Sequence, residues 1–272
     1  MHNGFDGEAS SRGMVYADLH VHTTASDGAM ALSTVPTAAR AAGVQVVAIT
    51  DHDRPHPDLA APVTERQGVT FIRGIELRVD SPQGAVDLLG YGVSETRSLE
   101  GVVERTQENR IERGGEIIRR VEAELAIDLG LKPAAGLGRP HIARAIADHP
   151  ESGYNYERAF AELIGANCPC YVPREIPDFD RSIAILRESC ALVGLAHPFR
   201  YPDPERALSL TEELDCVERW YPYGRPVDTD LLDRVIERNE LLPMGGSDAH
   251  DDRLGRAGLS ESAYRAVEAR LS

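Results

Sequence analysis

Short apolar runs rich in β-branched residues recur along the chain, and each ends in polar residues. Such runs predict strands. They cover Val15 to Val21, Val44 to Thr50, Val69 to Ile75, Val86 to Tyr91, Leu192 to Ala196, Cys216 to Trp220 and Leu241 to Met244. Between several of them, apolar residues are spaced to form one helix face, as in Val35, Ala38, Ala39 and Ala42. Alternating strands and helices predict an α/β protein with a mostly parallel sheet or barrel.

The stretch from residue 98 to 174 departs from this alternation. Apolar residues at helical spacing occur at Ile117, Ile118, Val121 and Leu125, and again from Tyr156 to Ile164, without a strand pattern between them. We therefore expect a metal-binding barrel formed by residues 14–97 and 175–272. Residues 98–174 are expected to form a helical insert that covers the mouth of this barrel.

Composition limits the classes of partner. The chain has 272 residues, with 29 Lys and Arg against 44 Asp and Glu, a net charge of −15. This balance argues against a face that binds long nucleic acid. No apolar stretch approaches the roughly 18 residues that span a bilayer, and the stretch Met1 to Gly13 is polar, without the apolar core of a signal peptide. We expect a cytoplasmic protein without a membrane partner.

Polar clusters with histidine follow four of the predicted strands, and a carboxylate follows a fifth. These residues are His20 and His22 with Asp27, His52 between Asp51 and Asp53, Glu76, His197, and Asp248 with His250. The carboxyl ends of barrel strands converge on one mouth, and imidazole and carboxylate are ligands of Zn, Mn and Fe. In an extended chain His20 and His22 project to the same side. The pattern predicts a shared metal centre, in which Asp51 and Asp53 either bind metal or support His52.

Six motifs resemble the PHP (polymerase and histidinol phosphatase) family of phosphoesterases. They are DLHVHTTASDG, ITDHD, GIE, GRPHIAR, LAHPFRY and GGSDAH, in this order between residues 16 and 250. The chain is most similar to the branch that hydrolyses small nucleotides. This resemblance implies a distorted, TIM-barrel-like (β/α) barrel of about seven strands and two or three divalent ions, with Mn, Zn or Fe as candidates.

The resemblance also implies how ligands are shared. His20, His22, Glu76 and Asp248 would surround one ion, Glu76 and His197 a second, and Asp27, His52 and His250 a third. The family commonly carries a histidine ligand of the second ion where this chain has Asp87. A carboxylate can still bind metal, but it changes the charge and hardness of the site.

Two arginines in these motifs, Arg139 and Arg200, are expected to bind phosphate, because guanidinium is a planar, bidentate partner of phosphate oxygens. His141 either contacts the substrate or orients Arg139. We interpret the chain as a metal-dependent phosphoesterase in which the ions activate hydroxide. The catalytic set would be Asp248, His250, Arg139 and Arg200, and His250 or a neighbouring acid would protonate the leaving oxygen.

The expected substrates are nucleoside monophosphates such as AMP, nucleoside 3′,5′-bisphosphates or short RNA ends. One alternative is a phosphatase of another small monoester, such as histidinol phosphate or a sugar phosphate. A second is a non-catalytic metal-binding module. An amidohydrolase with a binuclear centre would need a carbamylated lysine at a strand end, whereas Lys132, the single lysine, lies in the helical stretch. The oligomeric state is left open.

Overall fold

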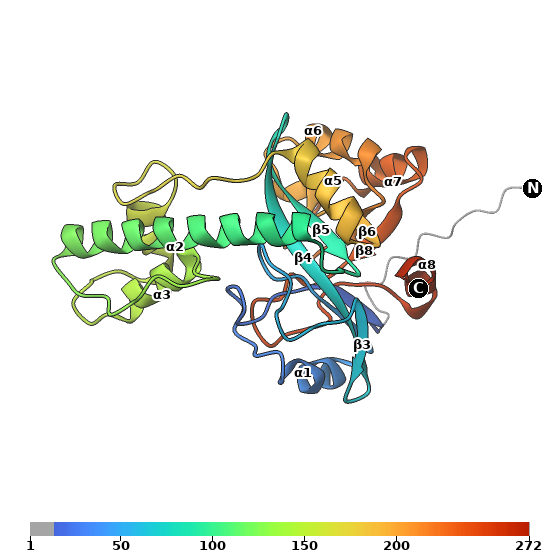
Figure 1. The fold of residues 1–272 in the computed structure, drawn as a ribbon, viewed down its shortest axis with the longest axis horizontal. Coiled ribbons are helices and arrows are strands. Elements are labelled where there is room, and N and C mark those ends of the chain that lie inside the picture. The colour runs from blue at the N-terminus through green and yellow to red at the C-terminus, as the bar shows by residue number, and fades with distance from the viewer. Residues whose placement is uncertain (1–13, 272) are drawn as a thin grey trace, which may run out of the picture.

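One curled sheet of eight strands forms the centre of the fold (Figure 1). The computed structural model describes residues 14–271, so the stretch Met1 to Gly13 lies outside the described residues. The strands are β1 (Ala17–Val21), β2 (Val46–Ile49), β3 (Val63–Arg66), β4 (Val69–Ser81), β5 (Gly84–Tyr91), β6 (Leu192–Leu195), β7 (Cys216–Trp220) and β8 (Leu242–Gly245). They are ordered β1-β2-β4-β5-β6-β7-β8, and β3 pairs with β4.

The chain that follows β8 returns to β1 and brings the two ends of the sheet together. Val21 pairs with Ala249, His22 N donates to Ala249 O at 3.0 Å, and Ala249 N donates to His20 O at 3.3 Å. Gly246 allows this approach, because a Cβ atom there would lie 2.3 Å from His20 N. The result is the distorted, TIM-barrel-like α/β architecture that the sequence predicts.

The β4–β5 hairpin departs from the predicted parallel arrangement. Four strand pairs are parallel, namely β1–β2, β2–β4, β6–β7 and β7–β8, whereas β5 is antiparallel to β4 and β6. The cause is a two-residue turn, Pro82-Gln83, which joins β4 directly to β5 without a helix. β4 therefore continues beyond its predicted end at Ile75. Glu76 lies within the strand, and Arg78 lies opposite Asp87.

Helices cover the sheet and bury its core. They are α1 (Val35–Ala42), α5 (Phe179–Ser189), α6 (Pro204–Ser209), α7 (Thr229–Arg238) and α8 (Glu261–Leu271), with short 3-10 turns at Pro198–Arg200 and Leu210–Glu213. Leu186 of α5 and Leu232 of α7 share one hydrophobic cluster with Leu88, Leu195 and Val217 of the sheet. This packing holds the strand ends in fixed positions, which is a requirement for a shared site.

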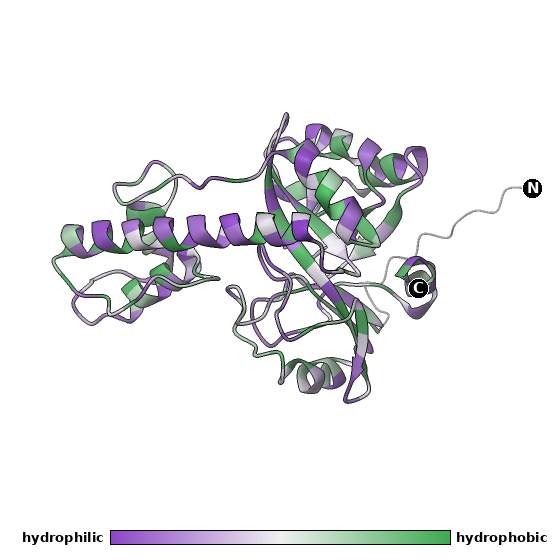
Figure 2. Ribbon diagram, viewed as in Figure 1, coloured by the Kyte–Doolittle hydropathy of each residue, from purple (hydrophilic) through white to green (hydrophobic). Residues whose placement is uncertain are grey.

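The stretch 97–164 is helical and has a hydrophobic core of its own. It contains α2 (Arg97–Leu125), α3 (Arg139–Asp148), α4 (Tyr156–Arg158) and the π-helix η1 (Ala159–Ile164). Ile117, Val121, Ile142 and Leu163 belong to this second core, whereas Leu99 and Val102 at the start of α2 belong to the core of the sheet. α2 extends away from the sheet (Figure 1), and mainly hydrophilic residues line it (Figure 2).

No helix within residues 14–271 combines the length and apolar character needed to cross a bilayer.

We predict that Gly246→Ala destabilises the fold by about 1–3 kcal/mol, the usual cost of overpacking. The added methyl would meet the backbone of His20, which cannot move without displacing β1. Urea unfolding measures the effect. Gly101→Ala in α2 is the matched control and should raise stability by about 0.4–1 kcal/mol, because only the flexible end of Arg105 approaches that position. Equal stability of Gly246→Ala and the parent would contradict this account of the closure.

Candidate metal centre and phosphate site

His20 and His22 lie at the end of β1 and turn their rings toward the same point. Both side chains are buried, and their Nε2 atoms lie 3.1 Å apart. Asp248, in the loop after β8, places Oδ1 3.1 Å from His22 Nε2 and 3.5 Å from His20 Nε2. Three ligand atoms from opposite ends of the sheet thus surround one position.

Glu76 of β4 is the carboxylate shared by most of the site. Its Oε1 lies 3.0 Å from His197 Nε2 and 3.4 Å from His20 Nε2, and its Oε2 lies 2.7 Å from His52 Nδ1 and 3.4 Å from His22 Nε2. The side chain is only 1% exposed. Burial would raise the pKa of Glu76, but His52 and His20 hold this pKa well below its usual range.

A second group of ligand atoms surrounds Asp27, in the loop after β1. Asp27 Oδ1 lies 3.2 Å from His250 Nε2 and 3.6 Å from His52 Nε2. The rings of His22 and His250 stack with centroids 4.2 Å apart. A third group consists of Glu76, Asp87 and His197, with Asp87 Oδ2 3.7 Å from His197 Nε2. The β4–β5 hairpin brings Asp87 to this group.

The donor atoms fit divalent metal ions. Three groups of side chains each offer ligand atoms that lie within 4.8 Å of one another. They are His22, Asp27, His52 and His250; His20, His22 and Asp248; and Glu76, Asp87 and His197. Asp27 Oδ1, Glu76 Oε2 and His22 Nδ1 are buried, and no hydrogen-bond partner among the described residues is aligned with them. Buried lone pairs without donors are costly, and a cation would satisfy the oxygens. All nine predicted metal ligands fall in these groups.

The pKa values of two neighbouring histidines, His22 and His52, shift in opposite directions. Burial lowers the pKa of His22 to about 4, assisted by the neighbouring His52 and His250. Burial also lowers the pKa of His52, but the Glu76 and Asp27 carboxylates outweigh it and raise this pKa to about 9. The local charge at each ring, rather than burial alone, decides its protonation in this site.

Strained backbone places two of the predicted ligands. His197 after β6 has a φ of 29°, and Asp248 after β8 has a φ of 48°. Asp53 also has a positive φ, of 59°. Such conformations are unfavourable for residues other than glycine and cluster at functional sites. At His197 and Asp248, two and three residues after β6 and β8, this conformation turns the side chain into the mouth.

Glu218 of β7 is a site residue that the sequence analysis missed. It is fully buried, its Oε1 lies 3.0 Å from His20 Nδ1, and its Oε2 accepts a hydrogen bond from His197 N at 2.7 Å. A carboxylate behind a metal-binding histidine fixes the ring orientation and raises its basicity. The available signal was a glutamate within an apolar strand, Cys216 to Trp220.

Asp51 and Asp53 take structural positions behind the ligands. Asp51 accepts hydrogen bonds from Thr23 N, Thr23 Oγ1 and Ser26 Oγ, at 2.6–2.7 Å, and so holds the loop that carries Asp27. Asp53 Oδ2 pairs with Arg110 and Arg174.

Arg200 and Asp248 are paired at the rim. Arg200 Nη1 donates to Asp248 Oδ2 at 2.9 Å, and Tyr221 Oη donates to the same oxygen at 2.7 Å. The Arg200 side chain is 54% exposed. Its position therefore allows contact with a ligand in the mouth as well as with Asp248.

Arginines gather where the helical stretch meets the barrel. Arg110 and Arg174 share the single carboxylate of Asp53. Arg113 Nε donates to Val172 O at 2.8 Å, and Arg139 Nη1 donates to Ile164 O at 3.5 Å, with no ion pair to a described carboxylate in either case. Burial, followed by the Arg139 and Arg174 cations, lowers the pKa of Arg113 to about 10. This group carries more positive charge than its carboxylate neutralises.

Arg139 begins α3 and lies over two aromatic rings. Its guanidinium carbon is 5.8 Å from the centroids of both Phe160 and Tyr171. Within residues 14–271, His141 makes no hydrogen bond to Arg139. Its Nδ1 instead accepts from Gly138 N at 3.0 Å and caps α3. Lys132 is exposed in the loop between α2 and α3.

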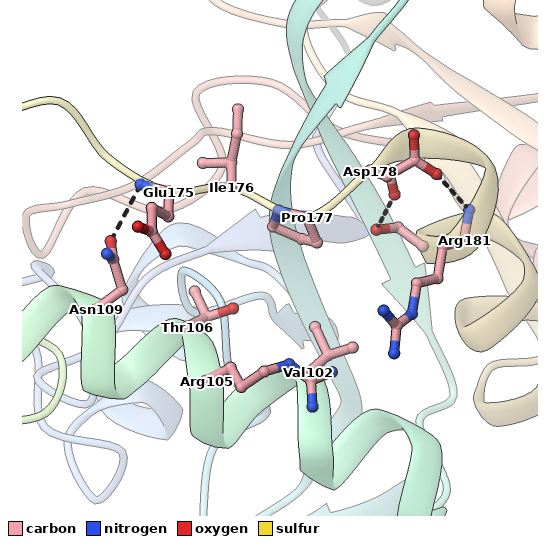
Figure 3. Close-up of a pocket in the computed structure, with 10 residues that line it drawn as sticks. Val102, Arg105, Thr106, Asn109, Glu175, Ile176, Pro177, Asp178 and Arg181 are labelled. Atoms are coloured by element: carbon pink, nitrogen blue, oxygen red, sulfur yellow. Dashed lines mark hydrogen bonds between the residues drawn. The ribbon is translucent and has the colours of Figure 1, made fainter.

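A separate cavity of about 210 Å³ lies between α2 and residues 175–182 (Figure 3). Arg105, Thr106, Asn109, Glu175 and Arg181 are among its lining residues. It contains none of the predicted site residues.

The α/β barrel with clustered histidines and carboxylates at its mouth defines a metal-dependent phosphoesterase. The chain belongs to the PHP domain family, which matches residues 18–158. A solved structure from Bifidobacterium adolescentis, named as a metal-dependent phosphoesterase, has the same fold, with a TM-score of 0.78. It is 23% identical in sequence, and the match covers 95% of this chain and 97% of that chain.

Three relatives carry names that state an activity. The phosphoribosyl 1,2-cyclic phosphate 1,2-diphosphodiesterase of Eggerthella lenta is 30% identical, over 86% of this chain and 93% of that protein. The 3′,5′-nucleoside bisphosphate phosphatase of Chromobacterium violaceum is 27% identical, over 69% of this chain and 68% of that protein. The 5′-3′ exoribonuclease Rnm of Escherichia coli is 29% identical, over 87% of this chain and 85% of that protein.

We predict that Glu218→Ala weakens metal binding by about 10- to 100-fold, because His20 loses the carboxylate that orients its ring. Titration of metal-free protein with Mn²⁺ or Zn²⁺, followed by metal analysis, measures the change. Glu237→Ala on the exposed face of α7 is the control and should bind metal as the parent does. Unchanged affinity in Glu218→Ala would rule out this role.

Proposed function

We propose that the protein releases phosphate from small nucleotides, namely nucleoside monophosphates such as AMP, nucleoside 3′,5′-bisphosphates or short RNA ends. The observation that carries the proposal is the juxtaposition of three groups of metal-ligand atoms with arginines that lack full charge compensation. The metal-ligand groups suit activation of water beside a phosphate. The arginines suit binding of the further negative charge of a nucleotide.

Two or three divalent ions, with Mn, Zn or Fe as candidates, would be held by the three groups. His20, His22, Glu76 and Asp248 would hold one, Glu76, Asp87 and His197 a second, and Asp27, His52 and His250 a third. When bound, such ions lower the pKa of water and neutralise charge on phosphate oxygens. Glu218 keeps His20 oriented, and Asp51 keeps the Asp27 loop in place.

Arginines would position the substrate from both sides of the mouth. Arg200 lies beside Asp248 at the rim of the barrel, and Arg139 would reach the mouth from the start of α3, with His141 two residues further along the helix. A planar guanidinium binds two phosphate oxygens at once. Residues 98–174 are proposed to cover the mouth, so that Arg113 and Arg174 add positive charge for a second phosphate of the substrate.

His250 is the proposed proton donor to the leaving oxygen. Burial lowers the pKa of His250, but the Asp27 carboxylate, 3.2 Å from its Nε2, and the Asp248 charge raise this pKa above its ordinary value overall. Its ring is 38% exposed, so it can face a substrate in the mouth. A protonated imidazole at this position can donate as the ester bond breaks. His250 would take this role when no ion is held by Asp27, His52 and His250, because an imidazole nitrogen binds a metal ion only through its free lone pair.

The relatives named as acting on a nucleoside bisphosphate and on RNA support this substrate range. The relative named for a phosphoribosyl cyclic phosphate supports the broader class of small phosphate esters. The net charge of −15 favours short substrates over long nucleic acid. A phosphate-release screen of the metal-loaded protein tests the proposal, with mononucleotides, 3′,5′-bisphosphates, short 5′-phosphorylated RNA, sugar phosphates and histidinol phosphate. Faster turnover of histidinol phosphate or a sugar phosphate than of every nucleotide would overturn it.

We predict that His22→Ala or Asp248→Ala abolishes phosphate release and lowers bound metal, because each removes a ligand atom shared by the central group. Colorimetric phosphate assays and metal analysis of the purified variants check both effects. His149→Ala is the control and should retain activity, since its ring accepts a hydrogen bond from Glu151 N and belongs to none of the three groups of ligand atoms within residues 14–271. Full metal content with parental turnover in either variant would refute the ligand assignment.

We predict that Arg139→Lys and Arg200→Lys each lower kcat/KM by roughly 10- to 100-fold, or about 1.5–3 kcal/mol, the range of a charge-assisted hydrogen bond. Lysine keeps the charge but loses the planar fork. Steady-state kinetics with a mononucleotide and a 3′,5′-bisphosphate measure the loss. If both variants cleave these substrates as well as the parent, the arginines do not bind the phosphate.

A further inference from the structure

Arg78 of β4 is bound to one of the residues that could hold a metal ion. Its Nη1 lies 2.6 Å from Asp87 Oδ2. The two residues face each other directly across the β4–β5 ladder, so the hairpin register sets their pairing. The same carboxylate oxygen lies 3.7 Å from His197 Nε2 within the group Glu76, Asp87 and His197.

The guanidinium therefore competes with a cation for Asp87. Arginine keeps its positive charge at every relevant pH, and the affinity of a carboxylate site for a divalent cation depends on its net ligand charge. Glu76 and Asp87 contribute two negative charges, and Arg78 offsets one of them. The Arg78–Asp87 pair thus weakens binding of an ion at this group.

Arg78 also has room to change partner. Its side chain is 37% exposed, whereas that of Asp87 is 10% exposed. A guanidinium at the edge of a site that binds phosphate has a second suitable acceptor, because phosphate brings up to two negative charges and several oxygens.

We propose that Arg78 couples the ion at Glu76, Asp87 and His197 to phosphate binding. Without an anion, Arg78 stays on Asp87 and the ion is held weakly. When a phosphate enters, Arg78 binds the phosphate, and Asp87 is released to the ion. This coupling is reciprocal, so the ion also strengthens phosphate binding. The inference rests on the proposed metal centre.

Metal and phosphate affinities of Arg78→Ala test this coupling. Metal-free protein is titrated with Mn²⁺ in the absence of phosphate, and metal-loaded protein is titrated with inorganic phosphate. We expect the weakest Mn²⁺ site to tighten by roughly 10- to 100-fold and phosphate binding to weaken by a similar factor, the range of one charge-assisted hydrogen bond. The opposite signs distinguish this role from a structural one, which would weaken both.

Two further variants make the result decisive. Arg206→Ala on α6 breaks an exposed pair with Asp203, the residue before the helix, and should leave both titrations unchanged. Asp87→Asn should lose the weakest Mn²⁺ site, which identifies that site. If Arg78→Ala binds Mn²⁺ no more tightly than the parent while Asp87→Asn loses a site, the coupling is wrong and the metal centre stands. If the parent and His22→Ala bind Mn²⁺ equally, the metal centre itself fails.

Discussion

The buried carboxylate of Glu76 is the charge on which the site depends. Its two oxygens approach the rings of His20, His22, His52 and His197, which come from three different strand ends. A carboxylate that is 1% exposed is stable only if positive charge surrounds it. The imidazoles supply part of this charge, and divalent ions would supply the rest. The closure of the sheet through Gly246 and the strain at His197 and Asp248 can be understood as the cost of bringing these groups together.

The β4–β5 hairpin decides how Asp87 reaches the site. Because β5 runs antiparallel to its neighbours, it delivers Asp87 to the mouth from the opposite direction and pairs it with Arg78. One site thereby contains a carboxylate with two possible partners, a cation of the protein and a metal ion. An arrangement of this kind can respond to an incoming anion, whereas a site of neutral histidines cannot exchange a charged partner in this way.

Arginines of the insert form a local group of positive charge within an acidic chain. The protein carries a net charge of −15, yet Arg110 and Arg174 both pair with the Asp53 carboxylate. Arg113 lies within the electrostatic influence of these two arginines and of Arg139. Asp53 directly follows His52, so the ligand loop and the arginine group are joined by one buried ion-pair network. A local field of this sign attracts short anions even though the remaining surface repels long ones.

The sequence by itself determined the α/β class, seven of the eight strands and which histidines and carboxylates come together at the mouth. The reason is that these residues directly follow apolar runs whose carboxyl ends must converge in such a fold. It did not reveal β3, the hairpin or Glu218. β3 (Val63–Arg66) is half exposed and lacks a buried apolar pattern. The direction of β5 depends on a two-residue turn and on pairing with β6, which is about 100 residues away. Glu218 acts on His20 across 198 residues of sequence, and only tertiary packing could decide which histidine it would orient.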